Sequence, residues 1–280
     1  MKLLRYGPAG EEKPGLLDQD GTIRDLSSVI DDVNGGTLSP ESIERLSGIE
    51  PGSLPAVTAE PRLGTCVGNI GKLVCIGLNY SDHAKESGMP IPTEPIVFMK
   101  ATSCISGPND DIELLRGSQK TDWEAELGIV IGSHTKYVSE ANALEHVAGY
   151  CVVNDVSERE WQLERQGQWI KGKSGDTYGP IGPWTVTRDE VPDPQALAIW
   201  LEVNGHRYQE GNTATMIFSA RTIVSYLSQC MSLQPGDVIA TGTPPGVGQG
   251  QNPQVFLKAG DVVTLGLDGL GSQQQTVVEA

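Results

Sequence analysis

The sequence predicts a mostly β fold with a minority of helices. The chain has 34 glycines and 18 prolines among 280 residues, and only 20% of its residues are charged, which is typical of many short strands joined by tight turns. Apolar runs of strand length recur along the chain, whereas residues 220–231 have the apolar spacing of an amphipathic helix. A chain of this length is ample for one large core with a smaller appendage.

The appendage is expected at the start of the chain, as a small α/β module over residues 1–65 that precedes a main domain over residues 66–280. Within the module, Asp18-Gln19-Asp20-Gly21 lies between two short apolar pairs and predicts a hairpin, because Asp-Gly tolerates the positive φ of a tight turn. Ser39-Pro40 predicts the start of a short helix, with serine as N-cap and proline at the first position. We expect the module to serve packing or dimer contacts and not chemistry.

The formal net charge of -16 repels polyanions, so nucleic acid and anionic membranes are poor partners. No apolar run approaches the roughly 20 residues of a membrane span, and residues 1–6 lead into glycine and proline and not into the core of a signal peptide. The five cysteines are scattered and form no Cys-x-x-Cys motif, which is typical of reduced core residues. We therefore expect a cytoplasmic protein.

Residues 122–131 read as a strand, and since side chains alternate between the faces of a strand, Glu124 and Glu126 share one face. A second apolar run, 147–153, places Asp155 just after its end. Three carboxylates make an all-oxygen site that suits Mg²⁺ or Mn²⁺, and neither cysteine nor histidine stands at ligand spacing for zinc. The alternative is that both glutamates line the wet face of an edge strand.

A candidate general base follows the strand predicted at 73–77. If Ser81 caps a short helix, His83 and Glu86 lie three residues apart on one side of it. A carboxylate beside imidazole raises its basicity and fixes its orientation, as a base that activates water requires. The proline-rich loop 87–95 would let this helix open and close as a lid. The alternative is a surface helix whose histidine and glutamate are solvated.

Three further segments could contribute to the same site. Ser157-Glu158-Arg159-Glu160 reads as a capping box, and the helix it starts would place Arg159 and Gln162 on one face near the carboxylates. Residues 169–183 are too rich in glycine and proline for a helix, so we expect a loop whose lysine could stabilise an enolate. The glycine-rich turn around Thr243 matches no nucleotide motif and could hold a carboxylate or be a plain turn.

These motifs, in their order along the chain, resemble the fumarylacetoacetate hydrolase family. They are residues 77–86, 124–126, Asp155 with Arg159 and Gln162, 171–174, and 241–248. The resemblance covers roughly residues 70–280 and implies a fumarylacetoacetase-like mixed β-sandwich roll, usually a homodimer, with Mg²⁺ or Mn²⁺ bound. The leading module resembles the N-terminal domain of many bacterial members.

The resemblance implies a role for nine residues by position. The metal ligands would be Glu124, Glu126 and Asp155. The groups that act in catalysis would be His83, Glu86 and Lys173. The substrate contacts would be Arg159, Gln162 and Thr243. These parts would hydrolyse a carbon-carbon bond in a 2,4-dioxo acid and release pyruvate with a second acid.

Residues 169–183 look like the branch of 2,4-diketo-3-deoxy-L-rhamnonate or fuconate hydrolases, whose members are often labelled ureidoglycolate lyase. Leu78 is a departure, since many relatives that act on small acylpyruvates or oxaloacetate carry arginine there, and this argues against a small dicarboxylate substrate. Two alternatives stay open. One is a ureidoglycolate lyase or oxaloacetate decarboxylase that uses the same metal, and the other is a non-catalytic metal-binding dimer.

Overall fold

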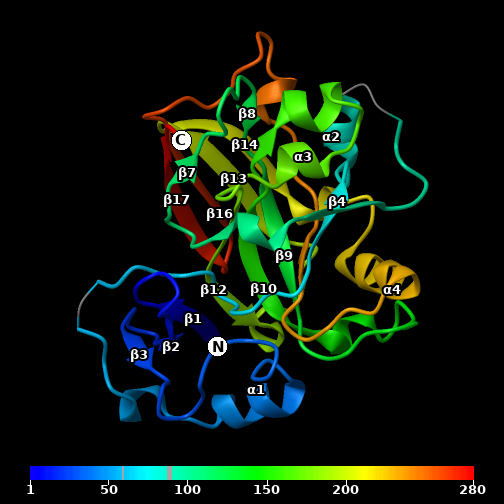
Figure 1. The fold of residues 1–280 in the computed structure, drawn as a ribbon. Coiled ribbons are helices and arrows are strands. Elements are labelled where there is room, and N and C mark those ends of the chain that lie inside the picture. The colour runs from blue at the N-terminus through cyan, green and yellow to red at the C-terminus, as the bar shows by residue number, and fades with distance from the viewer. Residues whose placement is uncertain (59, 87–89) are drawn as a thin grey trace.

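The computed structural model describes residues 1–58, 60–86 and 90–280, except for the side chains of His83, Ala84 and Glu86. Its described elements are mostly strands in two large sheets, with a few short helices at the edges (Figure 1). The predicted fold of many strands and few helices is therefore confirmed at the level of secondary structure. One buried apolar core runs between the sheets and continues into the N-terminal strands.

The larger sheet has ten strands in the order β3-β2-β1-β12-β10-β9-β15-β4-β5, with β6 paired to β12. It is mixed, since β9 and β10 run antiparallel whereas β15 and β4 run parallel. Every residue of β9 is buried, and Glu126 is the one charged residue in it, as expected of a central strand covered on both faces. The strands are β1 (Lys2–Tyr6), β2 (Lys13–Leu17), β3 (Ile23–Asp25), β4 (Leu73–Gly77), β5 (Ile96–Lys100), β6 (Ile105–Ser106), β9 (Ala125–Ile131), β10 (Val147–Asn154), β12 (Gly179–Thr187) and β15 (Val238–Ala240).

The second sheet has five strands in the order β14-β13-β16-β17-β7 and packs on the first through β13, β16 and β17. Buried and half-exposed residues alternate along β13, as expected of a strand with one face on the core. Asn204 and Gly205 form the β13–β14 turn with φ of 52° and 77°, which confirms the predicted hairpin. The strands are β7 (Ile112–Glu113), β13 (Ala198–Val203), β14 (His206–Asn212), β16 (Val262–Leu267) and β17 (Gly271–Val278), and a separate ribbon joins β8 (Thr121–Asp122) to β11 (Ser157–Glu158).

The N-terminal strands belong to the larger sheet, because β1 pairs with β12. The predicted hairpin is present as β2 and β3, and the Ser39 hydroxyl accepts a hydrogen bond from the Ser42 backbone N–H at 3.2 Å, as predicted for an N-cap. Arg62 donates to both carboxylate oxygens of Asp110, at 2.7 and 2.5 Å, and so joins the end of the module to the main domain. The module lies at the end of the molecule opposite α2 and α3 (Figure 1).

The helices are short. The α-helices are α1 (Pro40–Ser47), α2 (Ser81–Glu86), α3 (Ile170–Lys173) and α4 (Ala220–Cys230), the last as predicted. The 3₁₀ turns are η1 (Pro51–Ser53), η2 (Thr102–Cys104), η3 (Ala143–His146), η5 (Arg188–Glu190), η6 (Thr213–Thr215) and η7 (Gly248–Gly250), and η4 (Glu160–Glu164) is a π-helix. Within the described ranges no helix is long and apolar enough to cross a membrane. Four cysteines are buried and Cys230 is exposed, all as free thiols.

Two local predictions are wrong. Residues 169–183 contain α3 and most of β12, not a loop, because Gly172 lets α3 pack tightly on the neighbouring chain, where a Cβ would lie 2.3 Å from the Glu158 carbonyl oxygen. The capping box is also absent. Ser157 lies in β11 and its hydroxyl donates to the Asp155 carbonyl at 2.9 Å, while the π-helix begins after Arg159.

Candidate metal centre

Three buried carboxylates meet where β9 and β10 approach the end of the molecule that carries α2 and α3. One ligand oxygen each from Glu124, Glu126 and Asp155 lies within 4.8 Å of the others. Carboxylates this close repel one another in a buried site unless a cation compensates them. An all-oxygen set of three protein ligands fits a divalent hard cation and leaves coordination positions for water and substrate oxygens. The predicted common face of the two glutamates thus gives a candidate metal centre.

Side-chain amides hold the backbone between the two glutamates. The Glu124 backbone N–H donates to the Asn154 side-chain carbonyl at 3.2 Å, and the Ala125 N–H donates to that of Gln209 at 2.9 Å. The Thr243 hydroxyl donates to the Ala125 carbonyl at 2.8 Å and accepts from the Gln209 amide at 2.8 Å. The spacing of Glu124 and Glu126 is therefore fixed from both sheets.

Two buried lysines contact the carboxylates. The Lys173 ammonium lies 2.6 Å from a Glu124 oxygen and 2.7 Å from an Asp155 oxygen, so the predicted enolate-stabilising lysine is at the centre. Lys100 contacts the other Asp155 oxygen at 2.5 Å and donates to the Val156 carbonyl at 3.0 Å. Sequence reasoning missed Lys100, although a lysine that ends the apolar strand β5 was a signal.

Arg159 connects the centre to a fourth buried carboxylate, that of Asp122. Its guanidinium donates to Asp122 at 2.8 Å, forms an ion pair with Glu124 at 2.7 Å, and donates to the Gln162 side-chain carbonyl at 3.1 Å. Asp122 also accepts the backbone N–H groups of Gly248 at 2.6 Å and Gln249 at 3.0 Å. Sequence reasoning treated Asp122 only as the start of the acidic strand, but it anchors both Arg159 and the loop after Thr243.

The two glutamates differ in electrostatic environment. Burial opposes ionisation of Glu124, but the charges of Arg159 and Lys173 outweigh it and hold the pKa of this carboxyl well below its usual range. Burial, together with the charges of Asp155 and Glu124, raises the pKa of Glu126 well above its usual range. Burial would lower the pKa of Lys173, yet Asp155 and Glu124 raise it. In the metal-free site, Lys173 therefore stays charged, and the carboxyl group of Glu126 favours its neutral form.

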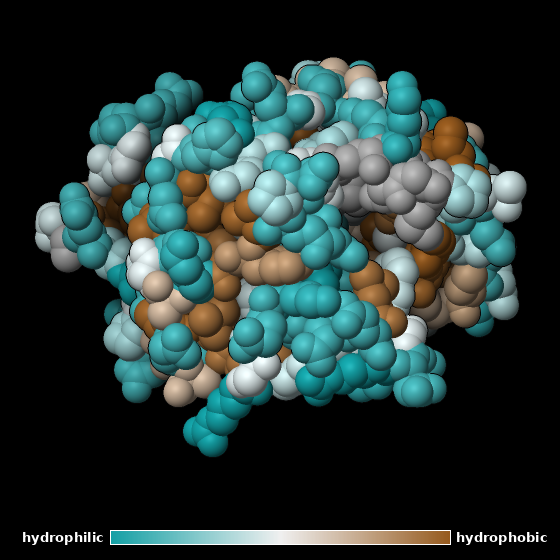
Figure 2. Space-filling model, turned by 90° about the horizontal axis from the view of Figure 1, so that it is seen from above, coloured by the Kyte–Doolittle hydropathy of each residue, from teal (hydrophilic) through white to brown (hydrophobic). Residues whose placement is uncertain are grey.

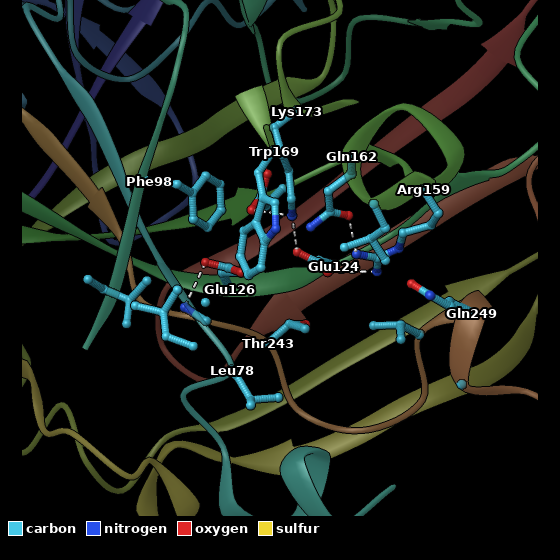
Figure 3. Close-up of a pocket in the computed structure, with 18 of the residues that line it drawn as sticks. Leu78, Phe98, Glu124, Glu126, Arg159, Gln162, Trp169, Lys173, Thr243 and Gln249 are labelled. Atoms are coloured by element: carbon cyan, nitrogen blue, oxygen red, sulfur yellow. Dashed lines mark hydrogen bonds and ion pairs between the residues drawn. The ribbon is translucent and has the colours of Figure 1, made fainter. Parts of the chain in front are cut away.

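The carboxylates line a cavity of about 410 Å³ that opens near α2 and α3. Figure 3 shows Glu124 between Lys173 and Arg159, with Leu78 and Thr243 across the cavity from Trp169. Figure 2 views this end of the molecule from above and shows apolar side chains exposed between polar ones. The described lining comprises Ile76, Gly77, Leu78, Ile96, Phe98, Glu124, Glu126, Asp155, Arg159, Gln162, Leu163, Trp169, Lys173, Gly242, Thr243, Val247, Gln249, Gly250 and Gln254.

The structure brings seven of the nine predicted site residues to this cavity, namely Glu124, Glu126, Asp155, Lys173, Arg159, Gln162 and Thr243. The other two, His83 and Glu86, belong to α2, but their side chains lie outside the described residues, so the predicted dyad stays a prediction. The helix α2 begins three residues after Leu78, which lines the cavity and has a φ of 51°. The positive φ at Leu78 thus turns the chain from β4 towards α2 beside the cavity.

Comparisons with known proteins agree with this geometry. The family model described as fumarylacetoacetate (FAA) hydrolase C-terminal matches residues 72–278. A provisionally named hydrolase of Burkholderia lata is 64% identical over 281 residues and covers 100% of both chains. The solved fumarylacetoacetate hydrolase from psychrophilic Exiguobacterium antarcticum is 36% identical with a TM-score of 0.87, and maleylpyruvate hydrolase from Sphingobium sp. SYK-6, in complex with manganese(II) ion and pyruvate, is 27% identical with a TM-score of 0.83. Both structures are covered at 100%, as is this chain, and the likeness confirms the predicted fold class.

Proposed function

The chain belongs to the fumarylacetoacetate hydrolase family, and on that premise we propose that it hydrolyses a carbon-carbon bond in a 2,4-dioxo acid with Mg²⁺ or Mn²⁺ as cofactor. The observation that carries the proposal is the buried carboxylate trio with Lys173 bridging two of its members. The products are pyruvate and a second acid. Among 2,4-dioxo acids we propose a 2,4-diketo-3-deoxy sugar acid.

In the proposed reaction, water adds to the 4-oxo carbon and the bond between carbons 3 and 4 breaks. Carbon 4 leaves as a carboxylic acid, and the electron pair stays on carbon 3 as the enolate of pyruvate, which then takes up a proton. A divalent ion held by Glu124, Glu126 and Asp155 would supply Lewis-acid chemistry to the carboxylate and 2-oxo oxygens. Lys173 places a fixed positive charge beside the developing enolate, where preorganised charge contributes most.

The protein groups around this chemistry have separate tasks in the proposal. His83, oriented by Glu86, takes a proton from the attacking water. Arg159 holds Glu124 in place, and Gln162 beside it presents an amide to the substrate. Thr243 holds the turn against the Ala125 carbonyl, so that its neighbouring backbone can face the substrate. The manganese and pyruvate in the Sphingobium maleylpyruvate hydrolase support this assignment of cofactor and product.

A second candidate is a ureidoglycolate lyase or oxaloacetate decarboxylase at the same site. The observation that favours it is the contact of Lys173 with both Glu124 and Asp155, because metal binding and charge stabilisation by these groups require no attack by water. A non-catalytic metal-binding dimer is the third candidate, and the buried Lys173 argues against it because a structural cation site does not require a competing ammonium. We also propose that the protein is a homodimer, and a monomer by light scattering at micromolar concentration would contradict this.

The test is a screen for pyruvate release from 2,4-dioxo acids with Mg²⁺, with Mn²⁺ and with chelator. The proposal expects turnover that chelator abolishes and that both Lys173→Met and His83→Ala reduce at least about 100-fold. Decarboxylation of oxaloacetate that survives in His83→Ala would favour the second candidate. Absence of metal-dependent turnover on every dioxo acid would leave the non-catalytic alternative.

A further inference from the structure

The metal centre and the side chains bonded to it form a cluster that is close to charge balance. The cluster holds three cationic and four anionic side chains. They are Lys100, Arg159 and Lys173, and Asp122, Glu124, Glu126 and Asp155. With every carboxylate ionised, the cluster carries one net negative charge. A divalent cation would change this to one positive charge, which the single carboxylate of a 2-oxo acid head group neutralises.

The two cations that line the cavity are already committed to the cluster. Arg159 donates from all three of its nitrogens, to Asp122, Glu124 and Gln162. Lys173 contacts two carboxylates, and its ammonium also lies 5.1 Å from the centre of the Phe98 ring. Each of these cations therefore already has its charge compensated by two carboxylates of the cluster, Asp122 and Glu124 for Arg159 and Glu124 and Asp155 for Lys173.

Apart from the charged side chains of the cluster, the lining residues that the structure describes are uncharged. Its walls include Leu78, Leu163, Trp169 and Val247, and the loop from η7 onwards adds the side-chain amides of Gln249 and Gln254. Among the lining residues that the structure describes, only Arg159 and Lys173 are cationic. At about 410 Å³ the cavity is in the range that encloses most of the surface of a small ligand, so a charge on the tail of the substrate would lose much of its hydration.

We propose that the acyl tail of the substrate, beyond carbon 4, is uncharged, and that the site rejects 2,4-dioxo acids with a second carboxylate on that tail. An alkyl tail would pack on Leu78 and Trp169, and a hydroxylated tail would bond to the amides of Gln249 and Gln254. A second carboxylate would face these groups without a cation and would leave the cluster with an uncompensated negative charge. This inference rests on the proposed function for the identity of the head group.

The test compares two substrates that differ only in charge, 2,4-dioxoheptanedioate and the amide of its terminal carboxyl group. With Mn²⁺ present, kcat/KM for pyruvate release is expected to be at least about 100-fold higher for the amide. Equal values for the two compounds would overturn the inference. A third substrate, 2,4-dioxoheptanoate, has an alkyl tail in place of the amide. A higher kcat/KM for this compound than for the amide would identify the apolar walls as the main contact of the tail.

A binding measurement keeps the tail inference separate from the proposed reaction. 2-Oxoadipate and its 6-amide carry the same head group but lack the 4-oxo group, so this hydrolysis cannot cleave them. Calorimetry with Mn²⁺ is expected to show the amide binding at least about 10-fold more tightly than 2-oxoadipate. If the amide shows this preference while no dioxo acid is hydrolysed, the tail inference stands and the proposed function fails. Equal binding, or no binding of either analogue, would overturn the inference.

A variant that adds a positive charge tests whether Gln249 faces the tail of the substrate. Gln249→Arg adds a cation to the cavity wall on the loop that Asp122 holds. It is expected to raise kcat/KM for 2,4-dioxoheptanedioate at least about 10-fold while lowering that for the amide. The matched control is Gln251→Arg, on the same loop but outside the cavity lining, which should change neither value more than about twofold. Equal effects of the two variants would refute a local role for the tail environment.

Discussion

Gly172 is expected to set the position of Lys173, and Gly172→Ala tests this. A methyl group at this position would lie 2.3 Å from the Glu158 carbonyl oxygen and 2.5 Å from the Gln162 backbone nitrogen. Both neighbours are backbone atoms and cannot rotate away. Relief of the overlap to an ordinary contact requires α3 to move by about 1 Å. Because Lys173 is the last residue of α3, the movement carries its ammonium away from the carboxylates.

The displacement has a calculable consequence. The contacts of Lys173 to Glu124 and Asp155, now 2.6 and 2.7 Å, would lengthen to about 3.6 Å, beyond hydrogen-bonding distance. Overpacking of this kind costs about 1–3 kcal/mol of folding free energy. A misplacement of about 1 Å in a reacting site costs up to about 100-fold in rate. For Gly172→Ala we therefore expect a lower free energy of unfolding in urea. We also expect kcat/KM with Mn²⁺ to fall by roughly 10- to 100-fold.

The control variant is Gly52→Ala, where the added methyl group meets no atom within 4 Å, and it should match the wild type in both measurements. Metal binding by calorimetry provides a readout that does not depend on the substrate. If Gly172→Ala keeps the stability, the metal affinity and the kcat/KM of the wild type, the close approach of α3 does not position Lys173, and the reasoning fails.

Three further predictions follow from other contacts. Asp122→Asn is expected to cost about 2–3 kcal/mol in urea unfolding, because Arg159 loses a buried ionic partner, and an unchanged midpoint would contradict this. Burial and the neighbouring carboxylates raise the pKa of Glu126, so the metal-free fold favours the neutral carboxyl group at low pH. The resulting stability is lost as pH rises from the ordinary value of 4.5 towards the raised pKa. Glu126→Gln should lack that loss, and unfolding curves of both proteins in chelator over a pH series measure it. Arg62→Met breaks the half-buried pair with Asp110 and should lower the free energy of unfolding by about 1 kcal/mol without changing kcat/KM.

The parts of the structure that were predictable depend on local patterns. The alternation of side chains along a strand predicted that Glu124 and Glu126 converge, and the position of Asp155 after an apolar run predicted its approach to them. The turn at Asn204-Gly205 and the cap at Ser39 depend only on residues that are adjacent in the sequence, so they too were predicted correctly.

The parts that sequence reasoning missed depend on contacts between distant segments. Lys100 and Asp155 are 55 residues apart, and nothing in strand β5 alone says which carboxylate its lysine meets. The glycines of 169–183 were interpreted as turn residues, whereas Gly172 is needed because two backbone segments touch there. A glycine that provides space and a glycine that provides conformational freedom look the same in one sequence.

The pairing of β1 with β12 has a practical consequence for anyone who trims the chain. The family model begins at residue 72, so an expression design that follows it would remove the three strands that continue the larger sheet past β12. The uncovered border of β12 would present unsatisfied N–H and C=O groups to any extended peptide nearby, which favours self-association and precipitation. The N-terminal strands β1, β2 and β3 therefore cover this edge of the sheet, and active preparations should retain them.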